Sequence, residues 1–224
     1  MTVPAPPSPF ELLTEVWPAG QLLYRVHDNR RRVSEFNPGT GNPTRWAFFG
    51  DPVVSVLYVA ETEEAAVSES IFHDLPLTGA RVFPEDYLNR VAGRVTCDRD
   101  LRLAQFAGGG LRRLGARPAT LADTDADTYA DTYADTVRWA EAAWTHRECD
   151  GIIWMSRHWN TSRAIVLFGD RVMSSSLRQD PSYARAFANP EDMEWLAELC
   201  AQVKVSFTPP SQPCGDLPAR LRPP

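Results

Sequence analysis

Residues 44–74 read TRWAFFGDPVVSVLYVAETEEAAVSESIFHD and place two regular elements next to each other. The run 53–60 is apolar and rich in β-branched residues, which is typical of a buried strand. Thr62 can cap a helix that follows, because its hydroxyl can accept a hydrogen bond from a free amide of the first turn. Glu63 and Glu64 would then lie at the positive end of the helix dipole. The stretch therefore predicts a buried strand and then an amphipathic helix.

The same stretch carries side chains that could do chemistry. Arg45 and Trp46 precede the strand, Tyr58 lies near its end, and Glu69 falls on the predicted helix one turn before His73. A guanidinium, a phenol and a carboxylate on neighbouring elements could hold an anionic nucleotide and act on a glycosidic bond. A strand and a helix with ordinary surface charges would explain the same residues, so the stretch alone leaves both interpretations open.

Composition narrows the class of protein. The chain has 224 residues, 43% of them hydrophobic, and a net charge of -6, which argues against a protein that binds nucleic acid by neutralising phosphates. Its four cysteines are far apart, so neither a disulfide framework nor a zinc ribbon is indicated. The first residues lack the pattern of a signal peptide and no apolar run is long enough for a bilayer, so we expect a cytoplasmic protein without membrane contact.

One domain, residues 10–207, is expected between two proline-rich ends, 1–9 and 208–224, whose composition predicts disorder. Residues 28–44 form a long polar loop, and such loops are often functional. The glycines 108–110 are interpreted as a turn. Further strands are predicted over 21–27, 91–97, 101–106, 151–155 and 164–169. Further helices are predicted over 10–15 and 111–114, through the TYAD repeat to about residue 147, and over 181–187 and 190–202. The irregular order of these elements favours an α+β domain with a mixed central β-sheet and flanking helices over a doubly wound fold.

Two more polar positions stand out. Ser156 and Arg157 follow an apolar strand, where a hydroxyl can face a pocket and an arginine can bind phosphate. A polar loop with Ser156 bonded to the backbone is the alternative. Arg25 lies inside an apolar strand, where a buried charge needs a partner or a ligand, unless the strand is at an edge and the side chain is in water. Motifs for phosphate-binding loops and hydrolases are absent, and the four histidines are too widely spaced to indicate a metal site.

These segments, in this order, resemble the RES domain, a family named for its Arg, Glu and Ser. The resemblance is carried by LYRV at 23–26, RW at 45–46, LYVAE at 57–61, AAVSESIFH at 65–73, DGIIWMSRH at 150–158 and AIVLF at 164–168. It implies a fold like that of ADP-ribosyltransferases and a bacterial toxin that degrades NAD⁺. It also implies a helix-turn-helix (Xre-type) antitoxin as the partner. A homodimer is compatible with the sequence but not required by it.

The resemblance further implies an NAD⁺ glycohydrolase or NAD⁺ phosphorylase, with NAD⁺ as substrate and no cofactor or metal. In this interpretation Glu69 stabilises the positive charge that develops on the ribose. The candidate catalytic residues are Glu69, Arg45, Tyr58 and Ser156, and the candidate NAD⁺ contacts are Arg25, Arg45, Tyr58, Trp46 and Arg157. Two alternatives stay open: transfer of ADP-ribose to a macromolecule, and nucleotide binding without catalysis. Val67 lies two residues before Glu69, where arginine-directed transferases often carry an acid. Its presence argues against that class of transferase.

Overall fold

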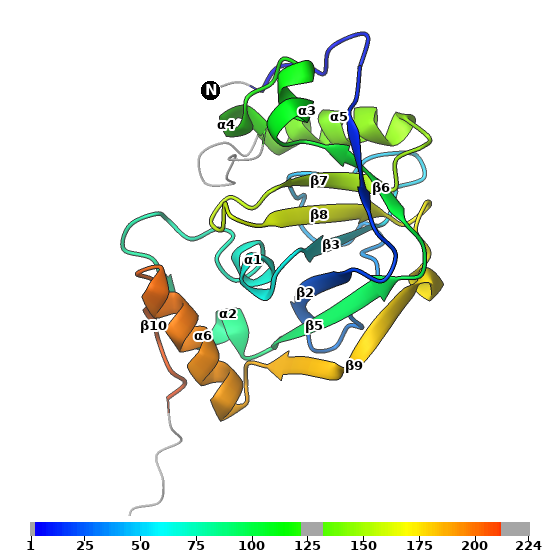
Figure 1. Ribbon diagram of the computed structural model, residues 1–224. Coiled ribbons are helices and arrows are strands. Elements are labelled where there is room, and N and C mark those ends of the chain that lie inside the picture. Colours follow the sequence, from blue (N-terminus) through cyan, green and yellow to red (C-terminus); the bar gives the residue numbers. More distant parts are fainter. Residues whose placement is uncertain (1–2, 122–131, 212–224) are drawn as a thin grey trace, which may run out of the picture.

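A mixed sheet of eight strands forms the centre of the computed structural model, which describes residues 3–121 and 132–211 (Figure 1). The strand order is β1-β6-β7-β8-β3-β2-β5-β9; β6 and β7 are parallel and the other neighbours are antiparallel. The strands are β1 (Thr14–Trp17), β2 (Leu22–Asp28), β3 (Val56–Ala60), β5 (Arg90–Cys97), β6 (Leu101–Gln105), β7 (Gly151–Met155), β8 (Arg163–Phe168) and β9 (Leu177–Ala186). A separate parallel pair joins β4 (Arg81–Val82) to β10 (Ser206–Phe207). The predicted α+β fold with a mixed central sheet is confirmed.

The helices gather in three places around this sheet (Figure 1). Helices α3 (Gly108–Arg113), α4 (Pro118–Leu121) and α5 (Thr132–Thr145) lie at the end that holds β6 and β7. Helix α1 (Glu63–Ser68) lies against β2, β3 and β8. Helices α2 (Pro84–Tyr87) and α6 (Pro190–Gln202) pack near β4 and β10 at the opposite end, and a 3-10 turn (Ser174–Ser176) precedes β9.

Strand β3 is covered on both faces, which explains its nearly unbroken apolar sequence. Leu57 and Val59 are buried in a cluster on one face, and Val56 is buried in a cluster on the other, against which Tyr58 also packs. Because side chains alternate across a strand, Tyr58 is directed to the same face as Val56. The register of β3 therefore decides which face receives the phenol.

Helix α1 begins as the sequence predicts. The Thr62 hydroxyl accepts a hydrogen bond from the Ala65 amide at 3.2 Å, which satisfies one of the unpaired donors of the first turn. The helix ends earlier than predicted, since Ser68 is its last residue and Glu69 is the C-cap. Glu69 is therefore fixed at the end of a short helix and not on the face of a longer one.

Two predicted helices are wrong. Residues 14–17 form the edge strand β1, paired with β6, and residues 181–186 belong to the edge strand β9, paired with β5. Pro181 is tolerated there because an edge strand has one side without ladder hydrogen bonds. In both segments, pairing with a distant strand overrides the local helical spacing. The remaining predicted strands and the helix at 190–202 are confirmed within one to three residues.

The glycines 108–110 open helix α3, where the sequence interpretation placed a turn. Gly110 must be glycine for a steric reason: a Cβ atom there would lie 1.9 Å from the Gln105 carbonyl oxygen. Beside it, a Cβ on Gly109 would meet only Leu13 Cδ1 at 3.9 Å. The close approach of α3 to the end of β6 therefore depends on one of two adjacent glycines.

Gly110→Ala is expected to lower the free energy of unfolding by about 1–3 kcal/mol or more, because the helix must move off the strand. Gly109→Ala is the matched control, and it should raise stability by about 0.5–1 kcal/mol through helix propensity. Urea denaturation followed by circular dichroism measures both. Equal stabilities of the two variants would contradict the close approach.

The described residues at the N-terminal end make specific contacts, although their composition predicts disorder. Val3 is buried in the main core, and the Pro4 carbonyl accepts a 2.7 Å hydrogen bond from the Trp139 indole. These contacts explain why a proline-rich segment is ordered: it covers a face of α5. Residues 212–224, and the beginning of the predicted TYAD helix before residue 132, lie outside the described residues.

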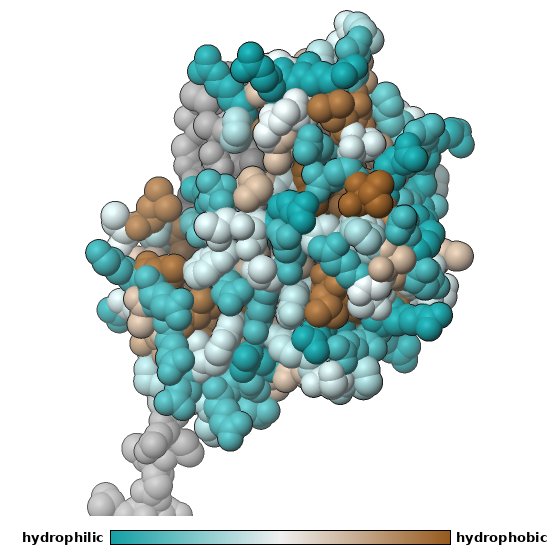
Figure 2. Space-filling model, in the orientation of Figure 1, coloured by the Kyte–Doolittle hydropathy of each residue, from teal (hydrophilic) through white to brown (hydrophobic). Residues whose placement is uncertain are grey.

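The outer surface in the view of Figure 2 is mostly hydrophilic, with hydrophobic side chains in separate small patches. None of the described helices combines the length and the apolar character that a membrane crossing requires.

Candidate functional site

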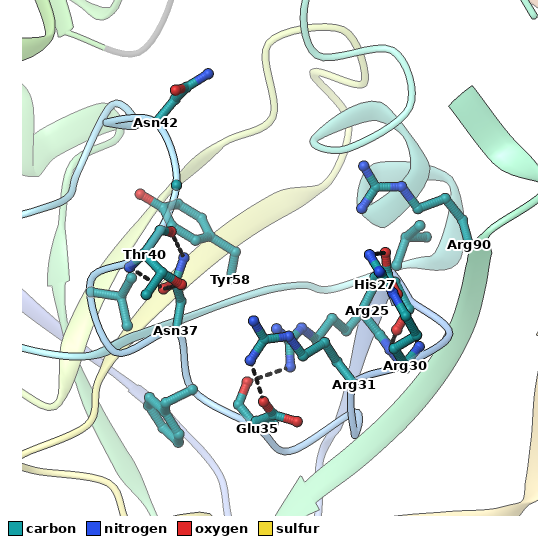
Figure 3. Close-up of a pocket in the computed structure, with 15 residues that line it drawn as sticks. Arg25, His27, Arg30, Arg31, Glu35, Asn37, Thr40, Asn42, Tyr58 and Arg90 are labelled. Atoms are coloured by element: carbon teal, nitrogen blue, oxygen red, sulfur yellow. Dashed lines mark hydrogen bonds and ion pairs between the residues drawn. The ribbon is translucent and has the colours of Figure 1, made fainter. Parts of the chain in front are cut away.

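The sheet opens between β2 and β3. Strand β2 pairs with β5 along its whole length, but its register with β3 consists of the single pair Tyr24 and Ala60. Asn37, from the long loop after β2, forms a bridge with Val56 on the β3 edge. A cavity of about 840 Å³ lies in this opening, lined by both strands and the loop (Figure 3). Its volume is in the usual range for a small-molecule site.

The two sides of this cavity differ in chemistry (Figure 3). One side, called the basic wall, carries Arg25, His27, Arg30, Arg31 and Arg90 together with the acids Asp28 and Glu35, so positive charge is in excess there. The other side carries uncharged hydrogen-bonding groups, namely Asn37, Thr40, Asn42 and Tyr58. The arrangement suits a ligand with an anionic end and a hydroxyl-rich or amide-bearing end.

Glu69 is held by groups from two other segments of the chain. Its Oε1 accepts a 2.8 Å hydrogen bond from the Ser156 hydroxyl and a 3.1 Å hydrogen bond from the Arg157 amide, both at the end of β7. Its Oε2 lies 3.7 Å from Nη1 of Arg45, which comes from the loop before β3. The Glu69 side chain is 10% exposed and that of Arg45 3%. The carboxylate therefore has a fixed orientation and a largely desolvated charge.

A small hollow of about 30 Å³ adjoins Glu69. Tyr24, Tyr58 and Trp154 line it together with the carboxylate, and it has room for about one water molecule. Tyr58, Val26 and Arg25 line both this hollow and the large cavity, so the two spaces are adjacent. Glu69 thus lines the small hollow, and the basic wall lines the cavity next to it.

Tyr58 stands between the two spaces as a neutral phenol. Its oxygen shares a 2.8 Å hydrogen bond with the Thr44 hydroxyl and accepts a 3.2 Å hydrogen bond from the Trp46 amide. Burial raises the pKa of Tyr58 to about 12, although these hydrogen bonds act in the opposite direction. The phenol stays protonated at physiological pH and can donate or accept a hydrogen bond, but it cannot act as a base there.

Arg25 finds its partners in the backbone of the long loop. Its Nη1 donates to the carbonyl oxygens of Arg32 at 3.2 Å, Val33 at 2.8 Å and Glu35 at 2.8 Å. Burial lowers the pKa of Arg25 to about 10, with the nearby Glu35 acting in the opposite direction, and the guanidinium stays charged at neutral pH. Arg25 therefore holds the loop that closes one side of the cavity.

A comparison with protein families now adds to this geometry. The family model described as the RES domain matches residues 22–187, from β2 to just beyond β9. The chain belongs to the RES domain family. A search of curated proteins found no match. The matched segment contains all the residues expected to act: Arg25, Arg45, Trp46, Tyr58, Glu69, Ser156 and Arg157.

The RES domain brings most of these residues together, although they are far apart in the sequence. Glu69, Arg45, Ser156 and the Arg157 amide meet directly, and Tyr58 borders the same hollow. Ser156 is fully buried, and its hydroxyl is used by Glu69. Ser156 and Arg45 therefore position the carboxylate.

Trp46 requires a correction. Its side chain is fully buried and packs edge-on against Phe106 at 5.3 Å and Trp154 at 5.6 Å between ring centroids. The ring lines neither of the two spaces, so in this structure it is directed into the core and not toward the cavity where the sequence suggested a substrate contact. An aromatic residue next to a site arginine is, in this fold, part of the core that supports the site.

Sequence reasoning missed much of the basic wall of the RES domain. The adjacent arginines Arg30 and Arg31 were visible as a charged run in a long loop, which was a usable signal. Arg90 gave no such signal, because it reaches the cavity only through the pairing of β5 with β2, which places it opposite Asp28. Among the described residues, no group of three or more His, Cys, Asp or Glu side chains is arranged to hold a metal ion.

Proposed function

We propose that this RES domain cleaves the nicotinamide–ribose bond of NAD⁺, with water or phosphate as the acceptor. The observation that carries the proposal is the placement of Glu69. This one carboxylate, held by Ser156, Arg157 and Arg45, lines a small hollow next to a cavity with a basic wall. Membership of the RES family supports the same choice of substrate, as does the volume of the cavity.

The chemistry needs only one carboxylate. When the bond from C1′ to the ring nitrogen breaks, its electron pair stays on the nitrogen, and nicotinamide leaves as a neutral molecule without protonation. The ribose develops oxocarbenium character, which the fixed negative charge of Glu69 stabilises in a largely desolvated site. An oxygen of the acceptor then bonds to C1′, and water gives up a proton in the process. Glycosidases need a second carboxyl group to protonate their leaving group, and this reaction does not.

The first experiment measures nicotinamide release when the purified protein is incubated with NAD⁺, with and without phosphate. Appearance of ADP-ribose in water, or of a phosphorylated product in phosphate, identifies the acceptor. If radiolabelled adenylate from NAD⁺ stays on a macromolecule, the activity is ADP-ribose transfer. Intact NAD⁺ in both buffers, with folded protein, would refute the proposal.

Ser156→Ala tests the positioning of the carboxylate. The substitution removes one hydrogen bond to Glu69 but no contact to the cavity, because Ser156 is fully buried. We expect kcat for nicotinamide release to fall by about 10–100-fold, as for other groups that orient a reacting side chain, with KM nearly unchanged. A rise in KM at unchanged kcat would instead place the hydroxyl in contact with the substrate.

The family resemblance also supports a biological role as the toxin of a bacterial toxin–antitoxin pair. We expect induced expression in a bacterial host to lower cellular NAD⁺ and stop growth. Co-expression of a helix-turn-helix protein encoded next to this gene should restore both. Growth arrest with unchanged NAD⁺ would separate toxicity from the proposed reaction.

A further inference from the structure

The basic wall of the large cavity carries more positive than negative charge. It contains four arginines and two carboxylates, Arg25, Arg30, Arg31 and Arg90 against Asp28 and Glu35. Each carboxylate is already paired: Arg30 binds Asp28 at 2.8 Å, and Arg31 binds Glu35. Arg30 lowers the pKa of Asp28 and Arg31 lowers that of Glu35, with smaller contributions from Arg90 and Arg25 respectively, so both acids are ionised at neutral pH. The wall still has two positive charges in excess.

Arg25 contributes its charge from behind the wall. Its Nη1 is occupied by three carbonyl oxygens of the loop and by no carboxylate, so its positive charge still acts on the cavity. The side chain is fixed in place by those bonds and cannot follow a ligand. Its part in anion binding is therefore electrostatic.

Arg90 is different because it is exposed, and it acts on Asp28, its partner across the ladder, only through longer-range electrostatics. It is the first residue of β5, and Figure 3 shows it extending toward the cavity from the strand that borders β2. In the part of the chain that the structure describes, the Arg90 guanidinium has neither an ion pair nor a hydrogen bond. A guanidinium with free donors at the wall of a cavity is suited to a bidentate bond with phosphate oxygens.

We propose that the Arg90 side of this cavity binds the diphosphate of a nucleotide, and that Arg90 supplies the direct contact. The excess of two positive charges on this wall matches the two negative charges of a diphosphate diester. The opposite wall, with Tyr58 and Asn42, faces the ribose that leads to Glu69. This assignment rests on the proposed function for the identity of the ligand, and it moves the diphosphate contact away from Arg45, which is buried against Glu69.

Calorimetric titration of the whole chain with ADP-ribose tests the assignment without requiring any turnover. Arg90→Ala is expected to weaken ADP-ribose binding by about tenfold or more, the usual loss for a charge-assisted hydrogen bond. Arg90→Lys should recover part of the affinity, because it keeps the charge but not the fork. Arg178→Ala is the matched control: Arg178 is also exposed on a strand of this sheet but lies outside the cavity, and its substitution should leave the affinity unchanged.

Inorganic pyrophosphate serves as a competitor and should displace ADP-ribose from the wild type more effectively than from Arg90→Ala. Equal affinity of Arg90→Ala and the wild type, an equal loss in Arg178→Ala, or no binding of ADP-ribose at all would overturn the inference. Binding that depends on Arg90 in a protein that does not cleave NAD⁺ would refute the proposed function and leave this inference standing. If Arg90→Ala cleaves NAD⁺ with the KM of the wild type, the proposed function stands and the inference about Arg90 is refuted.

Discussion

Glu69→Gln is expected to reduce kcat for nicotinamide release by about 100–1,000-fold, the usual loss when one electrostatic stabiliser of a transition state is removed. Glutamine has the same size and keeps an oxygen that can accept from Ser156 and the Arg157 amide. What it lacks is the negative charge that, in the proposed reaction, faces the developing oxocarbenium ion. Steady-state kinetics with chromatographic detection of nicotinamide measures the effect.

Two controls distinguish a loss of catalysis from a loss of folding. Removing the Glu69 charge leaves the buried Arg45 without its 3.7 Å partner, which can destabilise the fold, so thermal unfolding must be measured in parallel. Glu64→Gln is the matched control, because Glu64 is on the same helix but lines neither space. A folded Glu69→Gln protein with wild-type activity would remove the carboxylate from the mechanism. A similar loss in Glu64→Gln would point to a general disturbance of α1.

The second large effect concerns stability. Trp46→Ala is expected to lower the free energy of unfolding by about 3–5 kcal/mol, because it empties the space of a fully buried ring in the largest hydrophobic cluster. The Trp46 amide that donates to Tyr58 is retained in the variant, so the backbone contact to the site is not removed directly. Denaturation in urea, followed by far-ultraviolet circular dichroism, gives the difference.

Trp46→Phe distinguishes a role of the ring in core packing from a role in binding NAD⁺. Phenylalanine fills part of the same space, so the loss of stability should be smaller, and KM for NAD⁺ should stay close to the wild-type value. If Trp46→Ala unfolds like the wild type and instead raises KM, the ring contacts the substrate after all. The Trp46 ring would then have to leave the core when NAD⁺ binds.

The local sequence pattern was sufficient to predict an element where the residues that stabilise it lie within or next to that element. The strand at Val56–Ala60 follows from its apolar, β-branched run, and the start of α1 follows from the hydroxyl of Thr62 and the two acids after it. The pattern failed at β9, where apolar spacing indicated a helix. A ten-residue edge strand is stabilised by its hydrogen bonds to β5, and no local window contains that partner.

The sequence by itself determined the family, the mixed α+β class and the side chains that could act, because these depend on residue types and on their order along the chain. Only the tertiary structure decided where each of them lies and what it contacts. Ser156 and Glu69 are 87 positions apart and share a hydrogen bond, whereas Trp46 is next to Arg45 and faces the core. Arg90 reaches the cavity through strand pairing alone. A site of this kind is a set of long-range contacts, and their energy comes from packing and pairing between segments that no local pattern in the sequence can relate.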